Sequence, residues 1–571
     1  MVTTGGKRNR SGIASFAIVL AFIFSLLWQN SAAAQQTLAE KLLEIMRANH
    51  QITEEQYKQL KKEAEQEKAA QAGAAQAAAE QAAAVQAAVQ KAETAAARTA
   101  DAEKLFDIYH TGIAADNGEG GVMFNMKGIK VNFGGFIEAA GIYRSRNELN
   151  DVGSQFQAIP LANQPRYFQD ETRFSARQSR LTILAQGDYS DTVHLGGYYE
   201  MDFLGGAPTA NSNESDSYNL RIRQLFASAD WDSCGMHFLG GQAWSLVTQN
   251  TKGITPRQEQ IPLTIDAQYV VGFNWARQPQ FRITKDWDKT FWLSFSVENP
   301  QTTLATLPNG PNNNFGVNQT PGNLFGSNLS VNDIPDFVQK AAYESPWGHF
   351  EVFNLVRTFE SSLINHNSTF VANEEIVRDA VGGGFDIPVI PKQLDVQATG
   401  MYGAIGRYGS GQLADVTEDS TGALHPISAV HFLGGLTWQP CSPLQIYTYY
   451  GLENANKADF AKGRIGFGYG SEFYDEDVPP VGKSFGGLTS GLTSSGQIQQ
   501  IDQITIGDWY SFYQGNYGTL KLGLQYSFTQ DHYFSGVSAV NSISGAAIGH
   551  FIGGPTVNDH MFFASVRYYW N

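Results

Sequence analysis

The feature that most constrains this chain is a two-residue hydrophobic repeat, which recurs in short segments from about residue 123 to the C-terminus. In the last segment Phe562, Val566 and Trp570 fall on one face, and Ser565 and Arg567 fall on the other. Successive side chains of a β-strand point to opposite sides of the sheet, so this period predicts strands. One face is aliphatic with aromatic ends while the other keeps charges and amides, which suits a lipid-facing wall around a wet lumen.

The connections between these segments alternate between short and long. Short turns such as Ser190–Thr192 and Asp232–Cys234 are each followed by a long loop. Short turns on one rim and long loops on the other are typical of an outer-membrane barrel with both ends in the periplasm. The predicted fold class is therefore all-β transmembrane: a 16-stranded antiparallel outer-membrane β-barrel, wide enough to leave an aqueous channel. The predicted strands are 128–145, 172–189, 193–204, 218–231, 235–248, 268–284, 291–299, 335–344, 348–360, 378–390, 393–408, 429–439, 444–457, 496–514, 518–533 and 559–570.

The first 34 residues predict a cleaved secretory signal. A basic start (Lys7, Arg8, Arg10) precedes an apolar stretch from about 13 to 28, and Ala32–Ala34 offers a small-residue cleavage site. A retained anchor helix is the alternative. Beyond this segment the sequence contains no run of 18 apolar residues, so any further membrane crossing would have to use strands.

Residues 35–107 predict an α-helical, coiled-coil segment. Thr37-x-x-Glu40 and Thr53-x-x-Gln56 are two capping boxes, and an Ala/Gln-rich tract follows them. Ala and Val residues spaced by four and three between 78 and 96 form a thin heptad seam, which buries little area and should be weak alone. A solvated single helix or a disordered spacer is the alternative. A linker at 108–122 then leads into the barrel, 123–571, and the coil is expected in the periplasm.

Composition and motifs exclude several classes of function. The net charge of −16 argues against nucleic acid as a partner. Cys234 and Cys441 lie eight predicted strands apart, so we expect both thiols to be unpaired within one chain. We find no P-loop, no zinc-site spacing and no Ser/His pair on one strand face, and therefore expect no enzyme, no cofactor and no metal. The acidic run Asp475–Asp477 could hold Ca²⁺, but a solvated charge run is the simpler interpretation.

At the level of motifs the barrel segment resembles the DcaP-like trimeric porins, relatives of the phosphate- and polyphosphate-selective porins. The resemblance is carried by Ser179–Leu181, Tyr199–Phe203, Leu220–Arg223, Gly241–Ser245 and Arg277–Arg282. An N-terminal coil before the barrel is a further shared feature. The resemblance implies a homotrimer of 16-stranded barrels that passes small anions such as dicarboxylates. The chain departs from the usual aromatic C-terminus, because Asn571 follows Trp570.

Strand alternation predicts which charges face the lumen. Guanidinium groups bind carboxylate or phosphate with two parallel hydrogen bonds and stay charged, so an arginine ladder could pass an anion from site to site. The alternative is that the arginines pair with acids on neighbouring strands. The predicted anion-contacting arginines are Arg180, Arg221, Arg223, Arg282 and Arg357, and the predicted acidic wall is Glu200 and Asp202.

The third long loop, 249–267, is a candidate constriction. In 16-stranded porins the loop at this position folds into the lumen and narrows it, and Trp244, just before it, is predicted to point inward. The loop carries Lys252, Arg257, Glu259 and Asp266. An ordinary surface loop is the alternative.

These expectations favour a water-filled outer-membrane porin for passive diffusion of small hydrophilic solutes, biased toward anions such as carboxylates or phosphate. The expected partners are outer-membrane lipid and lipopolysaccharide, further copies of the chain and small anionic solutes. A structural tether or adhesin barrel without open-channel activity is the alternative, and it would need a lumen filled by bulky residues. The sequence does not identify the solute.

Overall fold

The computed structural model describes residues 44–45, 47–48, 53–59, 61–62, 122–126, 128–162, 164–205, 218–305, 332–364, 370–418, 424–459, 468–470, 497–537, 551–552 and 554–570. The chain divides into two compact units, Met1–Glu103 and Lys104–Asn571. Within these ranges, no helix has both the length and the apolar character needed to cross a membrane.

The described residues of the N-terminal unit are helical, and one predicted helix start is confirmed there. The backbone N–H of Gln56 donates to Thr53 Oγ1 at 3.2 Å, and the backbone N–H of Thr53 donates to Gln56 Oε1 at 3.0 Å. This reciprocal pair is a capping box, and it satisfies two backbone donors at the helix start. The predicted signal segment, the Thr37/Glu40 box and the heptad seam lie outside the described residues.

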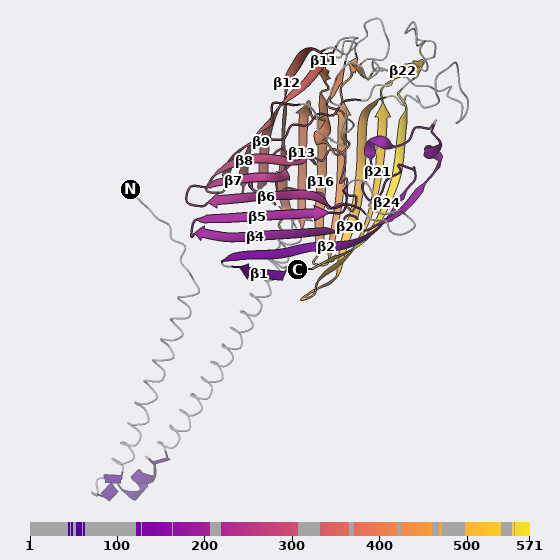
Figure 1. Cartoon of the computed structure of the whole chain (residues 1–571). Coiled ribbons are helices and arrows are strands. Elements are labelled where there is room, and N and C mark those ends of the chain that lie inside the picture. Colours follow the sequence, from indigo (N-terminus) through magenta and orange to yellow (C-terminus); the bar gives the residue numbers. More distant parts are fainter. Residues whose placement is uncertain are drawn as a thin grey trace. The chain divides into compact units, whose positions relative to one another are not determined.

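The second unit is a closed antiparallel barrel of sixteen strands (Figure 1). Each strand pairs with its neighbours in sequence, and β2 pairs with β24 to close the cylinder. The strands are β2 (Ile129–Arg144), β4 (Arg180–Ser190), β5 (Val193–Asp202), β6 (Arg221–Trp231), β7 (Met236–Trp244), β8 (Arg277–Trp287), β9 (Phe291–Glu298), β10 (Asp336–Ser345), β11 (Gly348–Ile364), β12 (Phe370–Ile390), β13 (Leu394–Gly403), β16 (Ala429–Cys441), β17 (Leu444–Ala455), β20 (Ile498–Gly515), β21 (Gly518–Tyr533) and β24 (Thr556–Tyr569).

Two further short strands complete the wall. β3 (Glu171–Ser175) and β4 share one position in the wall, because β3 pairs with the second half of β2 and β4 pairs with its first half. β1 (Val122–Met126) pairs with the start of β2, next to the point where β24 ends. Three pairs of very short strands lie in the connecting segments: β14 (Val416–Glu418) with β15 (Leu424–Pro426), β18 (Ala458–Asp459) with β19 (Gly468–Tyr469), and β22 (Gly536–Val537) with β23 (Phe551–Ile552).

Each predicted strand overlaps an observed one, but several boundaries are wrong. The predicted strand 378–390 begins earlier, because β12 starts at Phe370. Three other boundaries lie next to interior segments. The predicted strands 235–248 and 268–284 give way to β7, which ends at Trp244, and β8, which begins at Arg277. The predicted strand 393–408 ends at Gly403 and is followed by a short 3-10 helix, η4 (Gly406–Tyr408). In these three cases the alternating or apolar residues beyond the strand leave the wall and enter the barrel. They are apolar because they are buried in the interior, and not because they pair in a strand.

The two faces of the wall differ as predicted. Outward residues such as Phe281 are exposed, whereas Arg282 beside it is 5% exposed. One exception follows from a β-bulge: Glu200 pairs with Gln224 and Met201 pairs with Ile222, so Arg223 is the extra residue. A bulge shifts the alternation by one residue. Strict alternation along β6 would place Phe226 on the lipid side with Ile222, but after the bulge Phe226 points inward and is 6% exposed.

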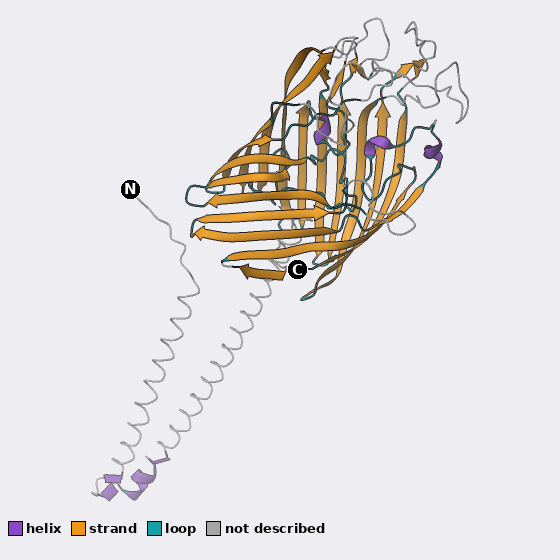
Figure 2. Cartoon of the chain, viewed as in Figure 1, coloured by secondary structure: helices purple, strands orange, loops and turns teal. Residues whose placement is uncertain are grey.

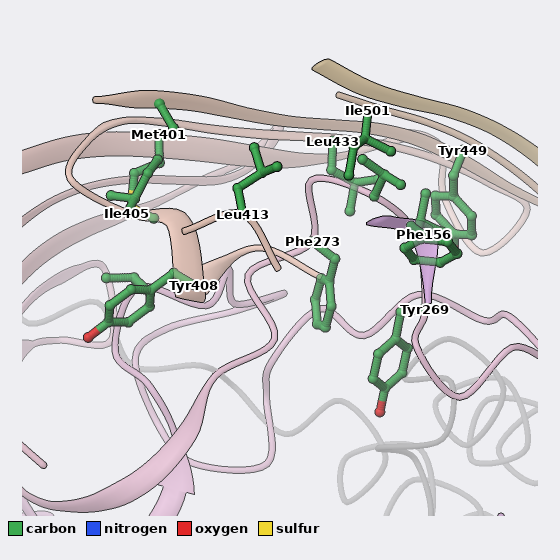
Figure 3. Close-up of a cluster of buried hydrophobic side chains, with 14 of the residues drawn as sticks. Phe156, Tyr269, Phe273, Met401, Ile405, Tyr408, Leu413, Leu433, Tyr449 and Ile501 are labelled. Carbon is green, nitrogen blue, oxygen red and sulfur yellow. The ribbon is translucent and has the colours of Figure 1, made fainter. Parts of the chain in front are cut away.

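The interior of the barrel is occupied by connecting segments (Figure 2). Residues 146–170, 245–276 and 404–418 contribute buried apolar side chains to one large cluster. Figure 3 shows Phe156 from the first of these segments beside the wall residue Tyr449, and Tyr408 with Ile405 and the wall residue Met401 at the other side of the same cluster. The first of these segments contains two 3-10 helices, η2 (Phe156–Ala158) and η3 (Pro165–Phe168).

The two cysteines are unpaired, as expected. Cys234 and Cys441 are both free and exposed in the described structure.

Candidate functional site

The loop between β7 and β8, residues 245–276, crosses the interior to the opposite wall. It is longer than the predicted 249–267, because both flanking strands are shorter than predicted. Its backbone N–H groups donate to side chains of β17, β20 and β21, so polar wall residues replace the strand partners that the loop lacks. These bonds are Leu263 N–H to the Tyr449 hydroxyl (3.1 Å), Ile265 N–H to Gln525 Oε1 (2.6 Å), Val271 N–H to Gln503 Oε1 (3.2 Å) and Gly272 N–H to Glu453 Oε1 (2.9 Å).

A small cavity lies where this loop meets the wall of β4, β5 and β6. It is lined by Arg180, Glu200, Arg223 and Tyr269 among others, and its volume is about 10 Å³. That is room for about one water molecule. The predicted charges of these strands therefore meet the predicted constriction loop at one place, around a small cavity.

Arg223 has its hydrogen-bonding groups fully engaged at this cavity. Its Nε donates to Glu200, its Nη1 donates to Asp202 Oδ2 at 3.0 Å, and its Nη2 donates to the Tyr269 hydroxyl at 2.7 Å. Arg221 makes a two-bond contact with Asp202, at 3.0 Å and 2.7 Å. Both arginines therefore pair with the acidic residues of β5, as the alternative interpretation describes.

Arg180 differs from these two arginines. Its only ion-pair contact among the described residues is Nη1 to Glu200 Oε1 at 3.8 Å. Its side chain is buried, and Nε and Nη2 have no hydrogen-bond partner. A buried guanidinium with free donors is costly unless a partner arrives, so Arg180 is the predicted lumen arginine that the protein leaves most available to an anion.

Arg282 is buried beside neutral acceptors. Its Nε and Nη2 donate to Gln280 Oε1 at 3.0 Å and 2.8 Å, and Nη2 also donates to the Trp244 carbonyl at 2.7 Å. No carboxylate lies within ion-pair distance of it in the described parts of the chain. Trp244 is 2% exposed and packs against Tyr269 and Phe273, so its predicted inward position is confirmed.

Arg357 is held in a buried network at another part of the wall. Its Nη1 and Nη2 donate to Asp415 at 2.6 Å and 3.2 Å, and its Nε lies 3.4 Å from Asp336. Burial raises the pKa of the Asp415 carboxyl, but the Arg357 guanidinium outweighs burial and keeps that pKa below its usual value. This geometry ties the 404–418 segment to β11; the anion contact of Arg357 stays a prediction.

The four predicted loop residues separate in space. Lys252 is exposed, and Arg257 lies over the Tyr198 ring with its guanidinium carbon 5.1 Å from the centroid. Glu259 is buried with Oε1 unpartnered, and burial raises its pKa. Asp266 is also buried and its pKa is raised by burial, although it accepts the backbone N–H groups of Ser154 at 3.1 Å and Gln268 at 2.9 Å. Asp266 therefore joins two interior segments, whereas Arg257 and Glu259 line the cavity.

Sequence reasoning missed three contributors to the site. Tyr269 lies in the loop and not in the predicted strand 268–284, and its hydroxyl accepts a hydrogen bond from Nη2 of Arg223; burial raises the pKa of that hydroxyl, and the Arg223 guanidinium more than reverses the effect. Arg277 lies over Trp244, with its guanidinium carbon 4.7 Å from the ring centroid. Lys340 pairs with Glu351 at 2.9 Å and donates to the Thr248 carbonyl at 2.7 Å, which anchors the start of the loop. Only the inward alternation of β10 and β11 could have indicated this last pair.

No family model and no curated protein matches the chain. Among solved structures, the outer membrane channel DcaP of Acinetobacter baumannii is similar, with a TM-score of 0.54, 17% identity, and coverage of 78% of this chain and 99% of that one. An anion-selective porin from Comamonas acidovorans has a TM-score of 0.41 and 11% identity over 77% of this chain and all (100%) of its own. OmpF of Salmonella typhi, in complex with daunomycin, has a TM-score of 0.38 and 10% identity over 79% of this chain and 100% of its own.

The similarity to DcaP covers the barrel and extends over nearly the whole of that protein. The predicted resemblance is thus confirmed at the level of the fold, while the relation to phosphate- and polyphosphate-selective porins stays a prediction. The described barrel has the fold of the DcaP outer membrane channel.

Proposed function

We propose that the chain is an outer-membrane porin through which small hydrophilic solutes diffuse passively, with a preference for anions such as carboxylates or phosphate. The fold is that of a protein described as an outer membrane channel, and the outward face of the barrel is apolar while its inward face carries charges. Such a wall separates lipid from a polar interior. The mature protein would lie in the outer membrane among lipid and lipopolysaccharide, with its N-terminal coil in the periplasm.

The observation that carries the anion preference is the incomplete neutralisation of Arg180. Arg221, Arg223 and Arg357 pair closely with carboxylates, whereas Arg180 keeps two unpartnered donors beside the small cavity. Charge acts most strongly where low-dielectric walls focus the field, so one incompletely neutralised arginine there outweighs many charges in distant loops. The negative total charge of the chain does not decide the selectivity.

The test is the reversal potential of the purified protein in planar bilayers under a salt gradient. We expect stepwise conductance with a reversal potential of anionic sign, and block of the current by phosphate. Arg180→Gln should move the reversal potential toward cations and weaken the block about three- to tenfold, since a hydrogen bond to a charged group is worth roughly 1.5–3 kcal/mol before solvent reduces it. Lys289→Gln, an equal charge change in an exposed turn, is the control. A cation preference in the unmodified protein would overturn the proposal.

A second candidate function is a barrel that does not conduct and serves as a tether or adhesin. The observation that favours it is the apolar cluster inside the barrel, where Phe156, Tyr269 and Tyr408 are almost fully buried. Bulky residues in the lumen are what this function requires. The same bilayer experiment separates the two functions, because a tether gives no conductance steps at any salt concentration.

We also propose a homotrimer. The support is the motif resemblance together with the thin Ala/Val seam, which needs subunits that are already held together elsewhere.

A further inference from the structure

Arg277 is a charged residue of the interior that strand alternation did not identify. It begins β8, directly opposite Trp244 in the register of β7 and β8, and it is half-buried. Its guanidinium carbon lies 4.7 Å from the centroid of the Trp244 ring. A guanidinium stacked on an aromatic face keeps its edge, with its N–H groups, available for a further partner.

The charge of Arg277 is not neutralised by the residues around it. In the described structure no carboxylate lies within ion-pair distance of it, and its Nη1 is buried without a hydrogen-bond partner. Its charged neighbours include Arg223, Arg221, Asp202 and Glu200. Asp202 is already bound by Arg221 at 2.7 Å and by Arg223 at 3.0 Å. The position therefore gathers more positive than negative charge, and the Arg277 side chain is only partly buried there.

Trp244 connects Arg277 to the other arginines that lack a close carboxylate. The Arg277 guanidinium lies over its ring, and its backbone carbonyl accepts a hydrogen bond from Nη2 of Arg282 at 2.7 Å. Its side chain and that of Arg180 line the same cavity. The ring is held in place by edge contacts with Tyr269 and Phe273, at centroid distances of 6.1 Å and 5.7 Å. Three under-neutralised guanidiniums thus converge on one rigid aromatic residue.

We propose that Arg277 forms a second oxyanion-binding site at the start of β8. It binds a carboxylate or phosphate group before that group reaches the cavity beside Arg180. Trp244 is its positioning residue. The oxyanion accepts hydrogen bonds from the edge of the Arg277 guanidinium, as carboxylates and phosphates do in two-bond arginine contacts. This site rests on the proposed passage of anions and adds the residue at which they first bind.

The experiment compares Arg277→Gln and Arg277→Lys with the unmodified protein, using inorganic phosphate and acetate as probes. We expect Arg277→Gln to raise the phosphate concentration for half-maximal block about three- to tenfold and Arg277→Lys to recover part of the loss. Lys289→Gln, at the other end of β8, should leave the block unchanged. Phosphate and acetate arms that respond alike indicate a general oxyanion site, and a loss for phosphate alone assigns the site to phosphate.

The positioning role of Trp244 is tested separately. Trp244→Phe keeps an aromatic face and should retain most of the phosphate block, whereas Trp244→Ala should lose it to the same degree as Arg277→Gln. Heat-dependent gel mobility checks that each variant remains a folded barrel. Equal block in Trp244→Ala and the unmodified protein would contradict this role.

Equilibrium binding of labelled phosphate to the detergent-solubilised protein makes the result independent of conduction. Reduced binding by Arg277→Gln supports the site even if the barrel gives no conductance, in which case only the proposed function fails. If phosphate binding and block in Arg277→Gln stay within twofold of those of the unmodified protein, the proposed site is overturned. An anionic reversal potential of the unmodified protein would still leave the proposed function standing.

Discussion

At the scale of single residues, the lumen arginines differ in what neutralises them. Arg223 forms ion pairs with two buried carboxylates, whereas Arg180 has one ion-pair contact, at 3.8 Å. Removing one partner of a buried pair leaves the other charge uncompensated, at a cost of about 3–5 kcal/mol. We therefore expect Arg223→Gln to lower the free energy of unfolding by about 3 kcal/mol, and Arg180→Gln to lower it much less. Denaturant unfolding in detergent measures both. Equal losses would show that Arg180 is also a wall-pairing residue.

A second residue-scale prediction concerns Glu148, in the interior segment 146–170. Burial raises its pKa from an ordinary value of 4.5 to about 8. Asp559 and Asp266 act in the same direction as burial, and the nearby Arg144 guanidinium acts in the opposite direction. The folded protein then holds a proton that the unfolded chain has already released, so stability falls as the pH rises from about 4.5 to about 8. The slope for one such group is at most about 1.4 kcal/mol per pH unit.

Glu148→Gln should remove this slope. The expected outcome is an unfolding midpoint that changes less between pH 5 and pH 8 than that of the unmodified protein, with the largest gain in stability at pH 8. Asp170→Asn, an exposed acid in the same segment, is the control and should follow the unmodified protein. A Glu148→Gln variant with an unchanged slope would contradict the prediction.

Alternation along each strand predicted which charges face inward, but it left open whether they contact anions or pair with acids on neighbouring strands. Arg180 and Arg282 point inward as expected, because their outward neighbours in sequence are apolar. The bulge at Arg223 could not be predicted, since it depends on pairing between β5 and β6. Arg277 shares the parity of the outward residues of β8 and is directed to Trp244 only because both lie at strand ends beside the loop.

At the scale of elements, the barrel was predictable and its contents were not. Strand period and connection length are local properties, and they located all sixteen strands. The path of residues 245–276 depends instead on acceptors such as Gln503 and Gln525, which lie more than 230 residues away in the chain. Local pattern therefore assigned 268–276 to a strand, although the apolar residues there are buried by the loop's own passage through the interior.

The hydrogen bonds that tie residues 245–276 to the barrel wall give a prediction at this scale. Gln525 Oε1 accepts the Ile265 N–H at 2.6 Å and the Tyr447 hydroxyl at 3.0 Å, so Gln525→Leu removes the acceptor of two hydrogen bonds at similar side-chain volume. An unsatisfied buried donor costs about 1–3 kcal/mol, which should loosen the loop. We expect larger current fluctuations and a higher mean conductance in single-channel recordings. Gln186→Leu, on β4 away from these ties, is the control. Identical traces for both variants would mean that the loop does not set the conductance.

At the scale of the whole molecule, the filled apolar interior of the barrel conflicts with the open lumen that the proposed channel needs. Inward polar residues such as Thr505 and Ser527 are fully buried, so the connecting segments cover the wall that a wide pore would expose. Under the proposed function, solutes pass beside Arg180, and a tight passage there favours selective binding over bulk flow, since binding energy must offset the desolvation of each solute. Conductance should therefore be small and should saturate as salt concentration rises. A large conductance proportional to salt would contradict this.

The N-terminal unit offers the last prediction. Its heptad seam of Ala and Val would bury little area, so the segment should assist assembly without being needed for the channel. Deletion of residues 35–107 should leave oligomers on a mild-detergent gel that dissociate at a lower temperature than those of the full chain, with unchanged single-channel conductance. The isolated segment should remain monomeric at micromolar concentration by sedimentation. A deletion that abolishes conduction, or an isolated segment that trimerises tightly, would show that the coil and not the barrel wall holds the subunits together.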